Sequence, residues 1–321
     1  MNNKNKPKSI FGLGYIFIPL IVNLLISYLV QMLFVGYVYF KETMRLIQNS
    51  PEMQAFLRKV QESSGSIDFS DIGVEVEKIM TTELTTELVN SIYTQVLSYT
   101  AIITIVTGVL TIPIFCWMMK RDRKRAQGIV YPIKQKLPIT KYILILLGSI
   151  SLCVALNNLL TLSQLANISK LYQETSEALY SINFPLQVIG LGIITPIAEE
   201  ILYRGVLYNR LKRISSLYMA MGFSTLIFGL LHVNLVQMIY ALICGFVFVW
   251  LYEKYGSLKA PIMAHICMNI TSVFLTQYSV FVWIYENKIR MTIVTVVCAT
   301  LTAAVYVCIA NIPNEYKKIQ E

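Results

Sequence analysis

Charge and histidine are scarce in this sequence. Only 14% of its 321 residues are Asp, Glu, Lys or Arg, there are two histidines, and 55% of the residues are hydrophobic. An average soluble domain carries about 25% charged residues. The composition therefore excludes an ordinary soluble globular protein and favours an all-α protein that crosses a membrane several times.

Other absences narrow the chemistry. The zinc signature His-Glu-x-x-His and the serine-hydrolase element Gly-x-Ser-x-Gly are both missing. An aspartyl intramembrane protease needs two membrane aspartates, yet Asp68, Asp71 and Asp122 are the only ones and all fall in predicted loops. None of the six cysteines lies in a predicted external loop, so we expect packing residues and no disulfide framework.

Apolar segments of the length that crosses a bilayer predict about eight transmembrane helices. Their approximate ranges are 10–40, 92–119, 142–163, 184–207, 216–234, 235–252, 260–284 and 291–310. The basic N-terminus and the basic segments 120–141 and 210–213 are typical of cytoplasmic loops, whereas the acidic segments 41–90 and 164–183 are expected outside. Both termini are then cytoplasmic. The net charge of +9 is an orientation signal and does not indicate a nucleic-acid partner.

The same pattern suggests a domain organisation. Residues 1–183 are expected to form a three-span scaffold with an acidic external segment at 41–90. Residues 184–310 would form a catalytic core, and 311–321 a cytoplasmic tail. The core is singled out because Glu199, Glu200, Arg204, His232 and His265 are the ionisable residues clearly inside predicted spans. Ionisable residues within a membrane usually mark a functional site.

Helical spacing assigns separate roles to the two glutamates. Glu200 and Arg204 are four residues apart and share a helix face, so the arginine can neutralise this carboxylate. Glu199 points about 100° away and remains free to face His232 and His265. Pro196 removes a backbone hydrogen bond just before this pair and should open or kink the helix.

Two further spacings complete the candidate site. His265 and Asn269 are four residues apart and can aim an imidazole and a carboxamide at one developing oxyanion. Phe228 shares a face with His232, and Tyr203 is a candidate support for either glutamate. If the membrane surface lies near residue 207, Glu199 sits about 12 Å deep, in the cytoplasmic half. If it lies at the serines at 215 and 216, the depth becomes about 24 Å.

At these residues the sequence resembles a known family. The stretches "EEILYRG", "FGLLH" and "HICMN" are similar, in order, to the three signature motifs of the CAAX-protease and bacteriocin-processing (Abi) family of intramembrane proteases. The resemblance covers about 185–285 and implies proteolysis of membrane-associated peptides or proteins. Glu199 would be the general base on water, His232 would help hold that water, and His265 with Asn269 would bind the oxyanion. The supporting residues would be Glu200, Arg204, Phe228 and Tyr203.

The sequence leaves several alternatives open. Glu199, His232 and His265 would make a three-ligand zinc site, but a glutamate-activated water without metal fits equally well. Expected substrates carry apolar or lipidated segments, and the composition favours a bacterial plasma membrane. Processing of peptides or immunity to bacteriocins is favoured over prenyl-protein maturation. A non-catalytic membrane scaffold and a proton- or metal-coupled transporter are the competing functions.

Overall fold

A computed structural model describes residues 13–62, 73–74, 76, 82–125, 138–180, 182–232 and 234–312. Every secondary-structure element in these ranges is a helix, as the composition predicts. The first half contains α1 (Leu13–Asn49), α2 (Pro51–Glu62), α4 (Thr82–Ser98), α5 (Thr100–Arg125), α6 (Ile139–Leu162), α7 (Leu165–Ile168) and α8 (Lys170–Tyr180). The predicted tail at 311–321 lies outside the described residues beyond position 312.

The second half begins with one long, irregular helical segment. Its parts are α9 (Phe184–Gln187), the π-helix η1 (Val188–Ile194), α10 (Thr195–Glu200), the π-helix η2 (Ile201–Tyr208) and α11 (Asn209–Leu211). The remaining helices are α12 (Leu217–Leu230), α13 (Leu235–Tyr255), α14 (Lys259–Gln277), α15 (Val280–Tyr285) and α16 (Lys288–Ala310).

Within the described ranges, six helices are long and apolar enough to cross a membrane. They correspond to six of the eight predicted spans: α1, α5, α6, the segment α9–α11, α13 and α16. The other two predicted spans became α12, which has only 14 residues, and α14, which has 19. At 1.5 Å per residue α12 measures about 21 Å, less than the hydrocarbon core. The count of eight therefore stays a prediction.

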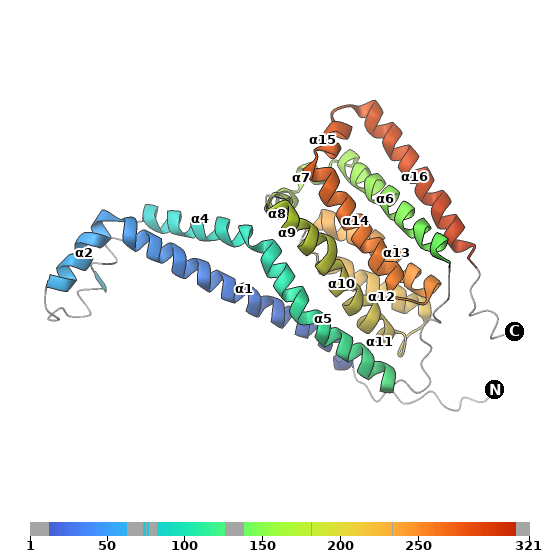
Figure 1. Ribbon diagram of the computed structural model, residues 1–321, viewed down its shortest axis with the longest axis horizontal. Coiled ribbons are helices and arrows are strands. Elements are labelled where there is room, and N and C mark those ends of the chain that lie inside the picture. The colour runs from blue at the N-terminus through green and yellow to red at the C-terminus, as the bar shows by residue number, and fades with distance from the viewer. Residues whose placement is uncertain are drawn as a thin grey trace.

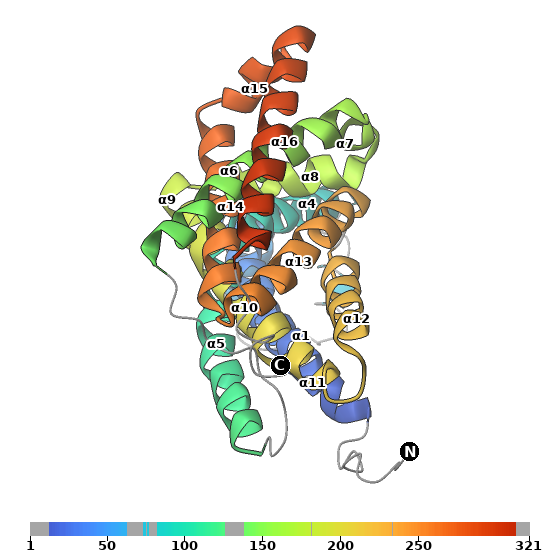
Figure 2. The same cartoon turned by 90° about the vertical axis from the view of Figure 1, so that its right-hand side faces the viewer.

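The helices form a bundle with an arm. In the bundle α16 packs along α6, α6 contacts α14, and α13 contacts both α12 and α14 (Figure 2). The arm consists of α1, α2 and α4, which extend beyond the bundle on one side (Figure 1). The 37 residues of α1 measure about 55 Å, well over the thickness of a hydrocarbon core, so α1 would tilt strongly in a membrane or project out of it.

A buried ion pair joins three distant helices at one end of the bundle. Asp122 of α5 and Arg210 of α11 are each 4% exposed, and Arg210 Nε donates to Asp122 Oδ2 over 2.6 Å. Arg210 Nη1 also donates to the carbonyl oxygen of Tyr15, and the Tyr15 hydroxyl contacts Asp122. These contacts hold the start of α1, the end of α5 and α11 together.

The same end gathers several other helix termini. Lys254 Nζ, at the end of α13, donates to the carbonyl oxygen of Ala310 at the end of α16 over 2.6 Å. The Tyr255 hydroxyl donates to the carbonyl oxygen of Lys141 at the start of α6 over 2.8 Å. We call this end of the bundle, where Asp122, Arg210 and Lys254 lie, the basic end. The side of the membrane that this end faces stays a prediction.

Loss of the buried ion pair should destabilise the whole bundle. We expect Asp122→Ala to lower the free energy of unfolding by about 3–5 kcal/mol, because the buried charge of Arg210 then loses its counter-charge. Glu174→Ala is the matched control, since it breaks the exposed pair of Lys170 and Glu174, worth at most about 1 kcal/mol. Unfolding in mixed detergent micelles measures both changes. Equal losses of unfolding free energy in the two variants would contradict the structural role assigned to the buried pair of Asp122 and Arg210.

Candidate active site

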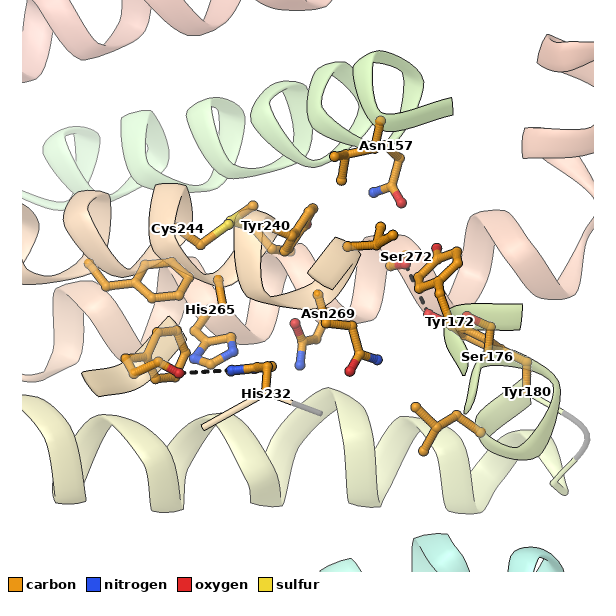
Figure 3. Close-up of a pocket in the computed structure, with 18 residues that line it drawn as sticks. Asn157, Tyr172, Ser176, Tyr180, His232, Tyr240, Cys244, His265, Asn269 and Ser272 are labelled. Carbon is orange, nitrogen blue, oxygen red and sulfur yellow. Dashed lines mark hydrogen bonds between the residues drawn. The ribbon is translucent and has the colours of Figure 1, made fainter. Parts of the chain in front are cut away.

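Four elements bring the candidate residues together. The glutamates lie on α10 and the arginine on η2, while α12 and the turn after it carry Phe228 and His232. His265 and Asn269 lie on α14, one turn apart. Figure 3 shows His232, His265 and Asn269 gathered at one end of a cavity. The structure therefore unites residues that are separated by up to 70 positions.

The pair of Glu200 and Arg204 forms as its spacing predicts. Both side chains are 0% exposed, and Arg204 Nη1 donates to Glu200 Oε1 over 2.8 Å. Arg204 Nη2 donates to the carbonyl oxygen of Gly245 on α13 over 3.0 Å. The guanidinium carbon also lies 4.6 Å from the ring centroid of Phe228, within the range of a cation–π contact. The arginine thus neutralises Glu200 and ties η2 to α13.

Glu200 has a second partner that sequence spacing did not predict. His265 Nδ1 lies 2.9 Å from Glu200 Oε1, the same oxygen that accepts from Arg204. An ionised carboxylate only accepts hydrogen bonds, so Nδ1 must carry a proton. His265 Nε2 is then directed away from Glu200 and lies 3.7 Å from Glu199 Oε2. Glu200 therefore fixes both the orientation and the tautomer of His265.

Glu199 is the accessible carboxylate of the two. Its side chain is 27% exposed, against 0% for Glu200, and it has no arginine within salt-bridge distance in the described part of the chain. Its neighbour is His265 Nε2. Because Nδ1 of that ring is already protonated, Nε2 donates a hydrogen bond only when the ring is an imidazolium. The neutral ring would accept at Nε2 instead.

His232 is oriented by its own helix. Its Nδ1 lies 2.8 Å from the carbonyl oxygen of Phe228, an acceptor, so Nδ1 carries the proton in this arrangement. Nε2 is then an acceptor that can hold a water. The Phe228 ring stands edge-on to His232 with centroids 5.1 Å apart, and it also lies edge-on to His265 and Tyr203. The Phe228 ring thus packs against both imidazoles, and Tyr203 packs against Phe228.

Asn269 is anchored through a carbonyl that a proline leaves free. Thr195 N–H donates to the oxygen of Gly190, the five-residue pattern of a π-helix. The next donor in that pattern would bond Leu191, but residue 196 is proline and has no N–H. Asn269 Nδ2 donates to the Leu191 oxygen over 2.8 Å instead. One of the two amide hydrogens of Asn269 is thereby used, and the other remains for a ligand.

Sequence reasoning missed two residues that shape the site. The Phe248 ring stacks on His265, with centroids 4.6 Å apart and planes at 24°. Gly245 accepts from Arg204, and a Cβ there would lie 2.9 Å from the Phe228 ring and 3.3 Å from Arg204 Nη2. A glycine among the bulky residues of α13 indicates that another group packs closely against the backbone at that position. Nothing in the sequence distinguished Phe248 from ordinary packing residues.

The cavity beside the site is uncharged and extends toward α8. It encloses about 190 Å³ and is lined by α6, α8, α12, α13 and α14 and by the two histidines. Helix α8 follows α6, whose 24 residues run about 36 Å away from the basic end. The cavity thus leads to the end opposite the basic loops. The opening of the site toward the cytoplasmic half stays a prediction, as does the side of the membrane that the basic end faces.

The predicted zinc ligands do not fit a metal in this arrangement. In the part of the chain that the structure describes, no three His, Cys, Asp or Glu side chains are grouped so that they could hold a metal ion. Glu200 holds Nδ1 of His265, and the Phe228 carbonyl holds Nδ1 of His232. Nε2 of each ring remains open, but Glu199, His232 and His265 are not gathered as a ligand set in the described structure, and no step below involves a metal.

Comparison with known proteins finds a similarity in the middle of the chain. A family model described as "Type II CAAX prenyl endopeptidase Rce1-like" matches residues 181–271. We call these residues the Rce1-like segment because of this similarity. A protein of Bacillus subtilis (strain 168) named "Putative membrane peptidase YdiL" is 29% identical over 110 residues, which are 34% of this chain and 45% of that protein. No solved structure matches.

The Rce1-like segment contains every candidate residue. It runs from just before α9 to just past Asn269 and so includes the three sequence motifs. The predicted resemblance to CAAX-type intramembrane proteases is confirmed for this segment. With six helices able to span a bilayer, the protein is an integral membrane protein. The chain spans 45% of the length of the curated relative it matches.

A substitution tests whether the close packing around Gly245 requires a glycine. Gly245→Ala should lower the free energy of unfolding by about 1–3 kcal/mol, because the new methyl group overpacks Phe228 and Arg204. Gly222→Ala on α12 is the control, since a Cβ there meets nothing within 4 Å and alanine favours a helix by about 1 kcal/mol. Thermal melting in detergent measures both. If Gly245→Ala proved as stable as Gly222→Ala, the close packing described here would be wrong.

Proposed function

We propose that the protein is an intramembrane endopeptidase that hydrolyses a peptide bond with a water activated by Glu199. The main support is that Glu199 is accessible beside a histidine whose orientation is fixed by a fully buried partner. Its location within the Rce1-like segment supports the same reading.

Hydrolysis begins at the exposed carboxylate. Glu199 removes a proton from a water that His232 Nε2 helps to hold, and the water oxygen bonds to the carbonyl carbon. The carbonyl electron pair moves to its oxygen, which becomes an oxyanion. The imidazolium N–H of His265 and the remaining amide hydrogen of Asn269 would stabilise that negative charge.

The second step returns the proton. The C–N bond breaks as the oxyanion collapses, and Glu199 gives the proton it took to the departing amine. Glu200 and Arg204 touch neither water nor substrate in this scheme, because both are fully buried and occupied with one another and with His265. They are positioning residues, and Phe228 and Tyr203 pack beside them.

The setting of this reaction is also part of the proposal. We place the protein in a bacterial plasma membrane, which agrees with the source of the matched relative. Substrates would be membrane-associated peptides or proteins with apolar or lipidated segments. CAAX-type processing, maturation of signalling peptides and immunity to bacteriocins are the biological settings that fit.

Substitution of Glu199 tests the proposed function. We expect Glu199→Gln to reduce cleavage of a quenched-fluorescent peptide library about 10²–10⁴-fold, because the amide cannot accept the water proton. The matched control is Glu253→Gln, since Glu253 accepts from Tyr208 and Lys212 near the basic end, away from the cavity. Purified protein in nanodiscs, with and without a chelator, serves for the measurement.

The outcomes separate the competing functions. Cleavage by the wild type and by Glu253→Gln, with loss in Glu199→Gln, would establish the protease. Loss of cleavage on adding chelator would show that a metal is required. Equal background from three folded proteins would refute proteolysis and favour a scaffold. Proton or metal uptake into proteoliposomes that depends on Glu199 would favour a transporter.

A further inference from the structure

The cavity contains polar side chains that lack partners. Tyr172 and Ser176 of α8 and Gln237 of α13 line it. Among the residues that the structure describes, the Tyr172 and Ser176 hydroxyls and the Gln237 carboxamide make no hydrogen bond to another protein group. Polar groups that a ligand would cover need partners from that ligand. These three residues therefore indicate what kind of molecule the cavity accepts.

Their placement is ordered. Tyr172, Ser176 and Tyr180 are spaced by four residues and form one stripe on α8. The hydroxyl of Tyr180 lies 3.1 Å from Ser272 Oγ and fastens this stripe to α14 (Figure 3). Gln237 is at the first turn of α13, across from the stripe, and lines the cavity with it. The rest of the lining includes apolar side chains such as Val236 and Met268 and polar ones such as Asn157. Polar groups without a protein partner thus come from two helices that line one cavity.

Away from His232 and His265 at one end, the cavity offers no counter-charge. No Asp, Glu, Lys or Arg lines it in the described structure. The nearest ion pair on α8, between Lys170 and Glu174, faces outward, with side chains 88% and 48% exposed. A carboxylate or an ammonium group would lose its water here without gaining a partner. A free carboxyl terminus and charged side chains are therefore poor occupants.

An isoprenoid chain is also a poor occupant, because it offers no hydrogen-bonding groups. It would fill the apolar part of the cavity and cover the three unpartnered polar groups, which would lose water and receive no hydrogen bond in return. A peptide backbone carries one donor and one acceptor on each residue, and it can satisfy hydroxyl and carboxamide groups on both sides at once. Small neutral side chains would then contact the apolar lining.

We propose that this cavity is the subsite for an uncharged, extended peptide segment next to the scissile bond, held through its main chain by Tyr172, Ser176 and Gln237. The inference rests on the proposed function, because it places the reacting carbonyl beside His265 and Asn269 at one end of the cavity. It implies cleavage within a chain, several residues from any free carboxyl terminus, and no requirement for a prenyl group.

Binding can be measured separately from cleavage. The full chain carrying Glu199→Gln, in nanodiscs, is incubated with a defined set of decapeptides built from Ala, Val, Leu, Ser and Asn, acetylated and amidated at their ends. Each decapeptide is also made with a single Lys or Glu at every position in turn, and in a form with a farnesylated cysteine. Mass spectrometry identifies the peptides that remain bound after separation.

The proposal predicts a distinct pattern of retention. Neutral peptides should be retained, and a charge at two or three consecutive positions should reduce retention at least tenfold, whereas a charge elsewhere should not. Gln237→Leu combined with Tyr172→Phe and Ser176→Ala should reduce retention of neutral peptides about tenfold. Thr175→Val is the control, because this hydroxyl lies on α8 but does not line the cavity.

The remaining outcomes are decisive. Absence of any retained peptide on folded protein, equal retention whatever the position of the charge, or preference for farnesylated peptides with no effect of the triple variant would each overturn the inference. The retained peptides are then offered to the wild type. Binding with the predicted pattern but without cleavage would refute the proposed function and leave the subsite in place. Cleavage without that pattern would refute only the subsite.

Discussion

One carboxylate oxygen organises the core of this protein. Glu200 Oε1 accepts from Arg204 over 2.8 Å and lies 2.9 Å from His265 Nδ1, in surroundings where Glu200 and Arg204 are wholly buried. A charge in such a place is stable only when its partners are fixed, so the contacts hold η2, α10, α13 and α14 in register. The arginine reaches α13 through Gly245.

This arrangement gives two adjacent glutamates opposite properties. Glu200 is committed to its partners and holds the imidazole of His265 in one tautomer, while Glu199 faces an exposed space and the other nitrogen of that ring. The proposed reaction at Glu199 therefore depends on Glu200, which does not contact the substrate. Ion pairs that support a reacting group in this way combine structural and functional roles, and a change in stability alone cannot separate the two.

Much of the fold and site could be predicted from local rules, and the remainder could not. Hydropathy gave six of the spans, and four-residue spacing gave the pair of Glu200 and Arg204. Spacing within one helix cannot place a second helix, so the contact of His265 with Glu200 and the stacking of Phe248 were missed. Pro196 was expected to open the helix, but the use of the freed carbonyl by Asn269 depends on the tertiary packing of α14.

The short length of α12 has a consequence for the membrane itself. A helix of 14 residues that enters a bilayer of ordinary thickness at the basic end stops inside the layer, and the polar backbone groups of the turn after it then lie there as well. Lipid tails cannot solvate such groups, so protein or water must surround the turn that bears His232. Water that reaches this turn would stand where the proposed hydrolysis consumes it.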